Sequence, residues 1–209
     1  MAVTTKTSRR REHTRERLLE AATDVFVEKG LKRVTVDDLV QAAGFTRGAF
    51  YSNFESVDEV FFEVFGRHAR ALLDRARMAI DAVPEGEFDV DTVGQLLEEV
   101  TSAGDAWVVL HTEFTLLAVR NAEAAAVLAT ASDPLRRQVA ELIGEVLHRL
   151  GRRPTVPLEQ LAQIVSVLQV HAALLAQVGD ASLTDGRPGS RGMSALLVDK
   201  LVRGFSEPV

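Results

Sequence analysis

The sequence predicts an all-α fold. Over most of its 209 residues, apolar side chains recur every three or four positions, the spacing that gives a helix one apolar face. No segment shows a convincing alternation of apolar and polar residues between turn signals, as a half-buried strand would. The composition, 46% hydrophobic and 26% charged residues, is that of a globular protein with a substantial core.

The first predicted helix runs from about Thr14 to Lys29 and has an apolar stripe opposite a charged face. The stripe consists of Leu18, Ala22, Val25 and Phe26. Gly30 follows directly and is suited to the left-handed backbone at a helix end. We therefore expect a helix of about four turns with one buried face.

Two short predicted helices follow the first. Thr35, with Asp38 three residues later, has the pattern of a helix cap, and Gly44 marks the end of that helix. Thr46 is placed to cap the next helix, which runs to about Asn53. A longer helix followed by two short ones, with a tight turn containing glycine between them, is the arrangement of a helix-turn-helix.

The longer C-terminal part also shows helical spacing. Helices are predicted over about residues 56–81, 93–100, 107–118, 122–131, 134–150, 158–178 and 193–205, with loops over 83–90 and 179–192. Ser56 and Glu59 form a capping-box pattern, and the pair Asp133–Pro134 predicts a break or kink. The helix over 158–178 is apolar on nearly all sides, so its own domain or a partner subunit must bury it.

Charge is spread unevenly along the chain, although the net charge is −6. Residues 1–17 carry a net charge of +4 and residues 56–209 a net charge of −8. A basic end on an acidic body is expected where only one end approaches a polyanion, although a solvated basic arm over residues 1–11 has the same composition.

Several classes of function are excluded or disfavoured by the sequence. The absence of cysteine excludes disulfides, thiolate nucleophiles and cysteine-bound metals. Catalytic motifs of hydrolases, nucleotide-binding loops and zinc proteases are missing, so no enzyme activity and no cofactor are predicted. A metal site formed by His68, His111 and His171 is less expected than buried neutral histidines. With no signal-peptide core and no apolar run of about 20 residues, we expect a cytoplasmic protein without a membrane partner.

The third predicted helix has the chemistry of a DNA-recognition helix. Thr46 and Arg47 lie at its leading end, and the Arg47 guanidinium can donate paired hydrogen bonds to a guanine edge or a phosphate. Gly48 and Ala49 are small enough to let the helix seat closely in a groove. Tyr51, one turn on, can reach a phosphate.

The stretch TVDDLVQAAGFTRGAFYSNFESVDEVFFEVF resembles the N-terminal domain of the tetracycline-repressor (TetR) family, and the resemblance covers roughly residues 12–65, including LLEAATDVFVEKG. It implies a helix-turn-helix DNA-binding domain over residues 12–55, after a basic flexible arm over 1–11. It also implies a helical effector-binding and dimerisation domain over residues 56–209.

The resemblance also implies which residues meet DNA. The expected DNA-contact residues are Lys32, Thr35, Thr46, Arg47, Gly48, Tyr51 and Ser52, while Phe45, Phe50 and Phe54 are expected in the core. One position departs from the family pattern, because Val57 stands where the family often has a phosphate-binding lysine. Lys32, Arg33 and the basic residues 9–11 are candidates to replace that charge.

A ligand pocket and a dimer interface are expected in the C-terminal part. The predicted pocket residues are Phe65, His68, Trp107, His111, Phe114, Leu168 and His171, although a core role is the commoner one for each taken singly. The predicted dimer-interface residues are Leu161, Leu168, Ala172, Ala176, Met193, Leu197 and Leu201. The resemblance implies that the helix over 56–81 joins the two domains, so that a ligand wedged against it would change the spacing of the two recognition helices.

The sequence thus predicts a transcriptional regulator that binds double-stranded DNA. The family's majority behaviour implies a repressor that binds a near-palindromic operator as a homodimer and is released by a small, mostly apolar effector. The alternative is an all-α interaction module of the same fold that has lost specific DNA binding. Val57 and the acidic body favour that alternative, whereas Arg47, Tyr51 and the basic arm oppose it.

Overall fold

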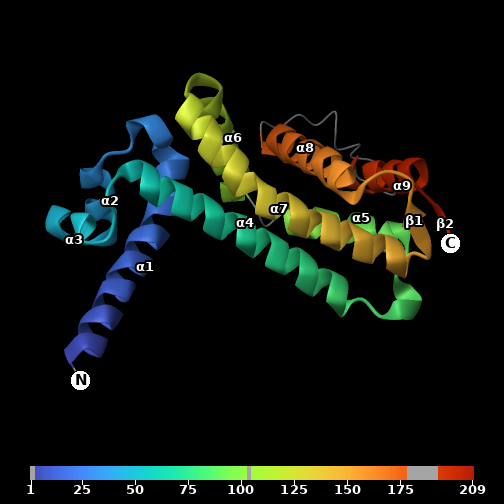
Figure 1. The fold of residues 1–209 in the computed structure, drawn as a ribbon, viewed down its shortest axis with the longest axis horizontal. Helices are drawn as coiled ribbons and strands as arrows, with labels where there is room; N and C mark the ends of the chain where they lie inside the picture. The colour runs from blue at the N-terminus through green and yellow to red at the C-terminus, as the bar shows by residue number, and fades with distance from the viewer. Residues whose placement is uncertain (1–2, 103–104, 178–192) are drawn as a thin grey trace.

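A computed structural model describes residues 3–102, 105–177 and 193–209 of the chain. Its helices are α1 (Val3–Lys29), η1 (Leu31–Arg33), α2 (Val36–Ala43), α3 (Arg47–Tyr51), α4 (Val57–Ala82), η2 (Glu85–Glu87), α5 (Val90–Ser102), α6 (Asp105–Arg120), α7 (Ala122–Arg149), α8 (Leu158–Gln177) and α9 (Met193–Phe205). The molecule is elongated, with α2 and α3 at one end, α4 and α7 along its length, and α9 at the other end (Figure 1). The predicted all-α class is confirmed.

The caps of α2 and α3 are those that the sequence predicts. Thr35 Oγ1 accepts a hydrogen bond from the Asp38 amide, and the Thr35 amide donates to the Asp38 carboxylate. Gly44 ends α2 with φ +73° and ψ +33°, a left-handed conformation that is costly for residues with a side chain. Thr46 then caps α3 by accepting from the Ala49 amide. These short-range bonds define the two short helices and the turn between them.

The start of α4 differs slightly from the predicted capping box. Ser56 Oγ accepts from the Glu59 amide at 3.1 Å, as expected. The Glu59 carboxylate, however, accepts from the Glu55 amide at 2.6 Å rather than from Ser56. One of the two hydrogen bonds of the predicted capping box is therefore present. The other is made by the amide one residue earlier, that of Glu55 instead of Ser56.

The structure extends α1 back to Val3, whereas the sequence predicted a flexible arm over 1–11 before a helix at about Thr14. Charged residues such as Arg and Glu have good helix propensity, so the polar segment can continue the helix without a buried face. Thr14, expected near the helix start, instead lies inside α1 and bonds back to the Arg10 carbonyl.

The predicted break at Asp133–Pro134 is wrong, because α7 is one helix with Pro134 inside it. Proline removes one backbone hydrogen bond, here the bond to the Thr130 carbonyl. Both Pro134 and Thr130 are exposed, so water can satisfy that carbonyl. Asp133 pairs with Arg136 one turn on rather than capping a new helix.

Two three-residue strands, which the sequence did not predict, close the far end of the molecule. β1 (Arg152–Pro154) pairs antiparallel with β2 (Ser206–Pro208). The Arg152 guanidinium donates to the Ser206 hydroxyl at 2.8 Å and to its carbonyl at 2.6 Å. Strands this short have too few residues to show alternation, so only the packing of distant segments reveals them.

One hydrophobic core joins the N-terminal helices to the rest of the chain. The core of α1–α3 also includes Phe61 and Phe65 from α4, and Leu110 and Phe114 from α6. All four of these side chains are at most 1% exposed. The first half of α4 and the middle of α6 therefore pack directly on the helix-turn-helix.

Candidate nucleic-acid interface and adjoining cavity

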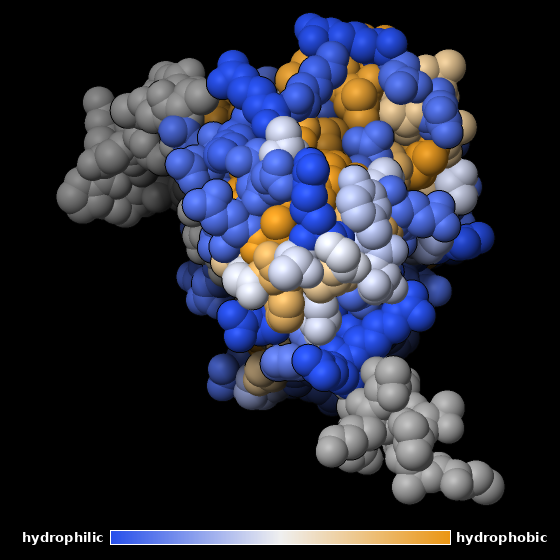
Figure 2. Space-filling view, turned by 90° about the vertical axis from the view of Figure 1, so that its left-hand side faces the viewer, coloured by the Kyte–Doolittle hydropathy of each residue, from blue (hydrophilic) through white to orange (hydrophobic). Residues whose placement is uncertain are grey.

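The surface around α3 is the candidate nucleic-acid interface. The predicted contact residues Lys32, Thr35, Thr46, Arg47, Gly48, Tyr51 and Ser52 are all exposed. From within, α3 is held by Phe50 and Phe54, which are buried, and Phe45 packs against the same core, so all three predicted core positions are confirmed. Figure 2 looks onto this end of the molecule and shows mostly hydrophilic side chains, with apolar patches between them.

Arg47 lies at the start of α3, as the sequence places it, and pairs with Asp37 of α2 at 2.8 Å. The two side chains are 63% and 66% exposed. Such an exposed pair is worth little in water, so the guanidinium can exchange Asp37 for a phosphate or a base edge at small cost.

Asp38 organises the N-terminus of α2. Hydrogen bonds from the Lys29 ammonium and then from the Thr35 amide and hydroxyl lower the pKa of this carboxyl from 3.8 to about 2. Asp38 is therefore charged at neutral pH, and its negative charge is stabilised at the first turn of the helix. Lys29 and Thr35 are both held in place by this carboxylate.

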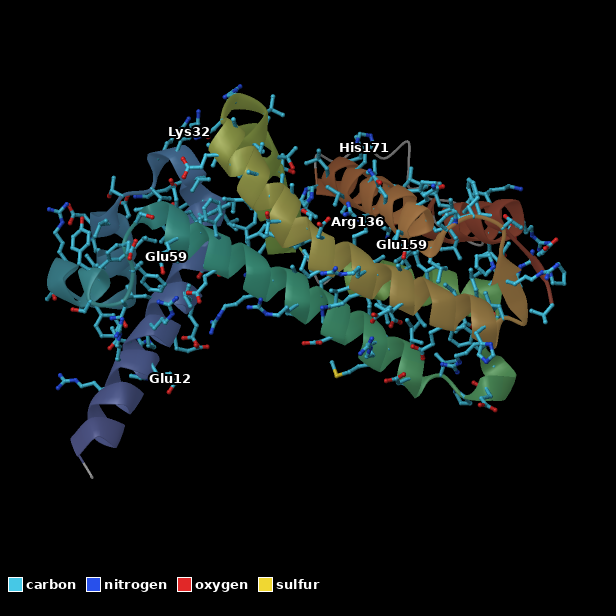
Figure 3. The ribbon with its side chains drawn as sticks, viewed as in Figure 1. Glu12, Lys32, Glu59, Arg136, Glu159 and His171 are labelled. Atoms are coloured by element: carbon cyan, nitrogen blue, oxygen red, sulfur yellow. The ribbon has the colours of Figure 1, made fainter. Side chains whose placement is uncertain are left out.

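The placement of Lys32 and Val57 bears on the positive charge predicted at the DNA-binding surface. Lys32 lies on η1 beside α6 and shares a hollow with Glu113 and Leu117, apart from α3 (Figure 3). Its DNA contact stays a prediction. Val57 is half-buried and packs against the N-terminal core, and a replacement of its missing charge by Arg33 or residues 9–11 stays a prediction.

Arg15, one of the basic residues near the N-terminus, has a structural role that the sequence did not indicate. Its guanidinium donates to the Asn53 carbonyl at 2.5 Å, pairs with Glu63 at 2.6 Å, and lies 4.2 Å from the centre of the Phe54 ring. It thus ties α1 to α4 and to the end of the helix-turn-helix. A sequence pattern carries no signal for this role because the partners are 38 or more residues away.

A cavity of about 430 Å³ lies next to this N-terminal core, between α4 and the C-terminal helices. Of the seven predicted pocket residues, Phe65, Trp107, His111 and Leu168 line it. The other three do not. Phe114 is fully buried in the core, His68 faces Thr23 of α1 at 3.2 Å, and His171 is exposed on α8.

Several of the residues predicted at the dimer interface lie inside the protomer instead. Leu161, Leu168, Leu197 and Leu201 line the cavity within the protomer, and Ala172 is half-buried. The side chains of Ala176 and Met193 lie outside the described part of the structure. Four of the apolar side chains on α8 and α9 that were predicted to face a partner subunit thus face the cavity instead.

The cavity wall is almost entirely apolar, and its one permanently charged side chain among the described residues is positive. Every lining residue from α4, α5 and α9 is hydrophobic. Among the described lining residues, the ionisable side chains are Arg136 of α7 and His111 of α6. The sequence carries no signal for Arg136 at this site, because an arginine on an amphipathic helix is ordinarily a solvated residue.

Aromatic rings connect the cavity with the helix-turn-helix. Phe65 contacts Trp107, with ring centroids 4.7 Å apart, and meets Phe114 edge-on at 5.0 Å. Phe114 in turn contacts Phe61, and Phe61 contacts Phe26 of α1. A side chain that is displaced in the cavity therefore presses on rings packed against α1.

A hydrogen bond makes a second connection. The Glu113 carboxylate of α6 accepts from the Leu31 amide at 3.1 Å, at the start of η1 between α1 and α2. Gly30, with φ +72°, lies so close that a Cβ there would be 3.2 Å from the same carboxylate. Because α6 also carries Trp107 and His111 at the cavity, a shift of α6 acts directly on the segment that joins α1 to α2.

Burial of two histidines predicts a pH-dependent stability. Burial lowers the pKa of His111 below 6.5, and burial together with Arg75 and Arg67 lowers the pKa of His68. Below about pH 6.5 the unfolded chain binds these protons more readily, so stability is present above that pH and is lost as the pH falls. We expect His111→Gln to lose less unfolding free energy than the parent between about pH 7 and pH 5 in denaturant titrations.

The exposed His148→Gln variant is the control for this measurement, because that side chain lies outside the cavity on α7. Equal pH dependence of the parent and His111→Gln would contradict the assignment of a buried, neutral His111.

Helix α8 is the one segment of the described chain that has the length and composition of a membrane span, over Leu158–Leu175. Only 11% of that window is buried. The window is not an uninterrupted apolar run, because it includes Glu159 and three glutamines. Of the two predicted ways to bury this helix, the protomer supplies little, which leaves the partner subunit. One such helix is weak evidence for a membrane, and the same exposed surface also suits a partner subunit.

Comparison with known proteins places these features in context. The sequence model described as "Bacterial regulatory proteins, tetR family" matches residues 18–64. The chain is 27% identical over 150 residues to the uncharacterized HTH-type transcriptional regulator YfiR of Bacillus subtilis, covering 70% of this chain and 71% of that protein. It is 43% identical over 54 residues to the HTH-type transcriptional repressor BepR of Brucella suis, covering 26% of each chain.

Solved structures share the fold over nearly the whole chain. Salmonella enterica GusR superposes with a TM-score of 0.67 at 19% identity, covering 91% of this chain and 94% of that one. Escherichia coli NemR in its reduced form gives a TM-score of 0.64 at 18% identity, covering 94% and 98%. At these identities the likeness concerns the fold alone.

Proposed function

The chain belongs to the tetR family of bacterial regulatory proteins and is a transcriptional regulator with a DNA-binding helix-turn-helix; on that premise we propose that it is a ligand-responsive repressor. It acts as a homodimer on a near-palindromic operator and releases DNA when a small, mostly apolar effector enters the cavity. We place this regulator in the cytoplasm, where its DNA is. Thr46, Arg47, Gly48, Tyr51 and Ser52 form the proposed recognition surface, with Thr35 on a phosphate.

The position of Phe65 carries this proposal. Its ring lines the cavity and is also 1% exposed in the core that holds the helix-turn-helix. Close-packed interiors transmit displacement because they have few voids to absorb it. An effector that moves Phe65 or α6 therefore changes the position of α2 and α3, and a two-fold dimer converts that change into a wrong spacing of its recognition helices.

The proposed dimer uses the outward face of α8, with α9 beside it (Figure 1). From Gln160 to Gln177, α8 has no Asp, Glu, Lys or Arg. Leu196 on α9 is 45% exposed and does not line the cavity, whereas Val167 on α8 is 63% exposed and lies at the edge of the cavity lining. A helix face without charge and with large exposed apolar side chains is typical of a surface that a second subunit covers.

Substitution of Leu196 by glutamate is expected to convert the dimer into a monomer, because a carboxylate would be buried without a partner at the interface. Sedimentation or light scattering measures the change. Val119→Glu is the matched control, since Val119 is 79% exposed and lies on α6, outside the proposed interface helices. A dimer that survives Leu196→Glu would remove this face as the interface.

Selection of bound sequences from a random duplex pool tests the function itself. Enrichment of a near-palindrome by the purified protein, with affinity that falls steeply as salt rises, supports a dimeric sequence-specific regulator. A well-folded dimer that enriches no sequence would instead favour the alternative, an interaction module of the same fold that has lost its DNA contacts.

A further inference from the structure

The cavity has a polar side and an apolar side. Its wall from α4, α5 and α9 is hydrophobic throughout, and along α4 it extends from Phe65 to Ile80. At 1.5 Å per residue that distance is about 22 Å. Apart from Ser206 of β2, the polar lining residues lie on α6, α7 and α8, as His111, Ser132, Arg136, Gln163, Ser166 and Gln169. The shape and polarity match a long apolar chain with a polar group at one end.

The sign of the charge follows from the same wall. No aspartate or glutamate is among the described residues that line the cavity, and Arg136 is the cation there. A cationic ligand would lose its hydration without gaining a counter-ion, whereas an anion would gain one. Figure 3 shows Arg136 on the side of α7 that faces α8.

Arg136 is available for such a ligand at small cost. In the structure it pairs with Asp133, one turn earlier on α7, and the two side chains are 40% and 58% exposed. A pair this exposed contributes little, so a carboxylate in the cavity can replace Asp133 as the partner of the guanidinium. The planar guanidinium also suits two-point hydrogen bonding to a carboxylate.

We propose that the effector is a single-chain amphiphile with an anionic head, held by Arg136 at the junction of α6, α7 and α8, with its chain along α4. This inference rests on the proposed role of the cavity as the effector site. His111 lines the same wall, with its ring 5.4 Å from that of Trp107, and burial lowers its pKa, so it would meet the head as a neutral imidazole. Each buried CH₂ of the chain should strengthen binding about fourfold.

The test uses Trp107, the only tryptophan of the chain, as an intrinsic fluorescence probe in the cavity wall. The full-length protein is titrated, below micelle formation, with dodecanoate, dodecyl sulfate, dodecanol and dodecyltrimethylammonium, four probes with the same chain. We expect the carboxylate to bind at least about 10-fold more tightly than the ammonium. The sulfate shows whether the site takes anions in general or carboxylate in particular.

Variants then assign the preference to one residue. Arg136→Gln should weaken dodecanoate about 10-fold and leave dodecanol within about threefold, whereas Asp133→Asn should strengthen dodecanoate. Arg137→Gln is the matched control, because Arg137 is adjacent to Arg136 in the chain but is exposed and does not line the cavity. An ammonium that binds as tightly as the carboxylate, or a preference unchanged in Arg136→Gln, overturns the inference while leaving the cavity an effector site. No binding of any probe overturns both.

Discussion

Replacing Phe114 by alanine is expected to lower the free energy of unfolding by about 3–5 kcal/mol, the cost of removing a fully buried aromatic side chain. Phe114 is 0% exposed and contacts the rings of Phe61, Phe62 and Phe65. The substitution leaves a void between α6 and the first half of α4, where neighbouring rings can relax only in part. Denaturant titration followed by circular dichroism measures the loss.

Val119→Ala is the control on the same helix. Because Val119 is 79% exposed, its truncation should change the unfolding free energy by no more than about 0.5 kcal/mol. A cost below about 1 kcal/mol for Phe114→Ala would show that this ring is not closely packed, and would favour the pocket role that its spacing on α6 predicted.

Arg47→Ala is expected to weaken operator binding about 5- to 150-fold, equivalent to about 1–3 kcal/mol for a good contact to a base edge. If Arg47 reads a base, the loss should come with relaxed preference at one operator position. If it binds a phosphate, the loss should be uniform across sequences and the salt slope should fall by about one. Titration of labelled operator at several salt concentrations separates the two results.

Two further variants make this result specific to α3. Arg120→Ala removes an exposed arginine at the end of α6 and should leave operator affinity unchanged. Asp37→Asn removes the ion-pair partner of Arg47 together with a negative charge beside α3, so it should bind DNA at least as tightly as the parent. Unchanged binding by Arg47→Ala would remove α3 as the recognition helix.

The N-terminal elements were predictable because their signals are local. Thr35 with Asp38, Gly44 and Thr46 act on neighbouring amides and carbonyls within a few residues, so the pattern of residue types is enough to place α2, the turn and α3. The apolar spacing along α6 and α9 is likewise a local signal, and it was enough to predict these two helices. The predicted break at Pro134 is wrong because an exposed position on a long helix tolerates the missing backbone hydrogen bond. The sequence rule treats the same missing bond as the end of a helix.

The sequence by itself determined the helical class, the helix-turn-helix and the residues that α3 presents to solvent, since periodicity and caps depend on near neighbours along the chain. Tertiary structure alone decided which apolar residues face a cavity and which fill a core. Phe65 and Phe114 have the same chemistry and the same helical spacing, yet only Phe65 reaches the cavity. Packing between helices distant in sequence makes that difference, and it also turns Arg136 toward the cavity and binds Arg15 into the fold.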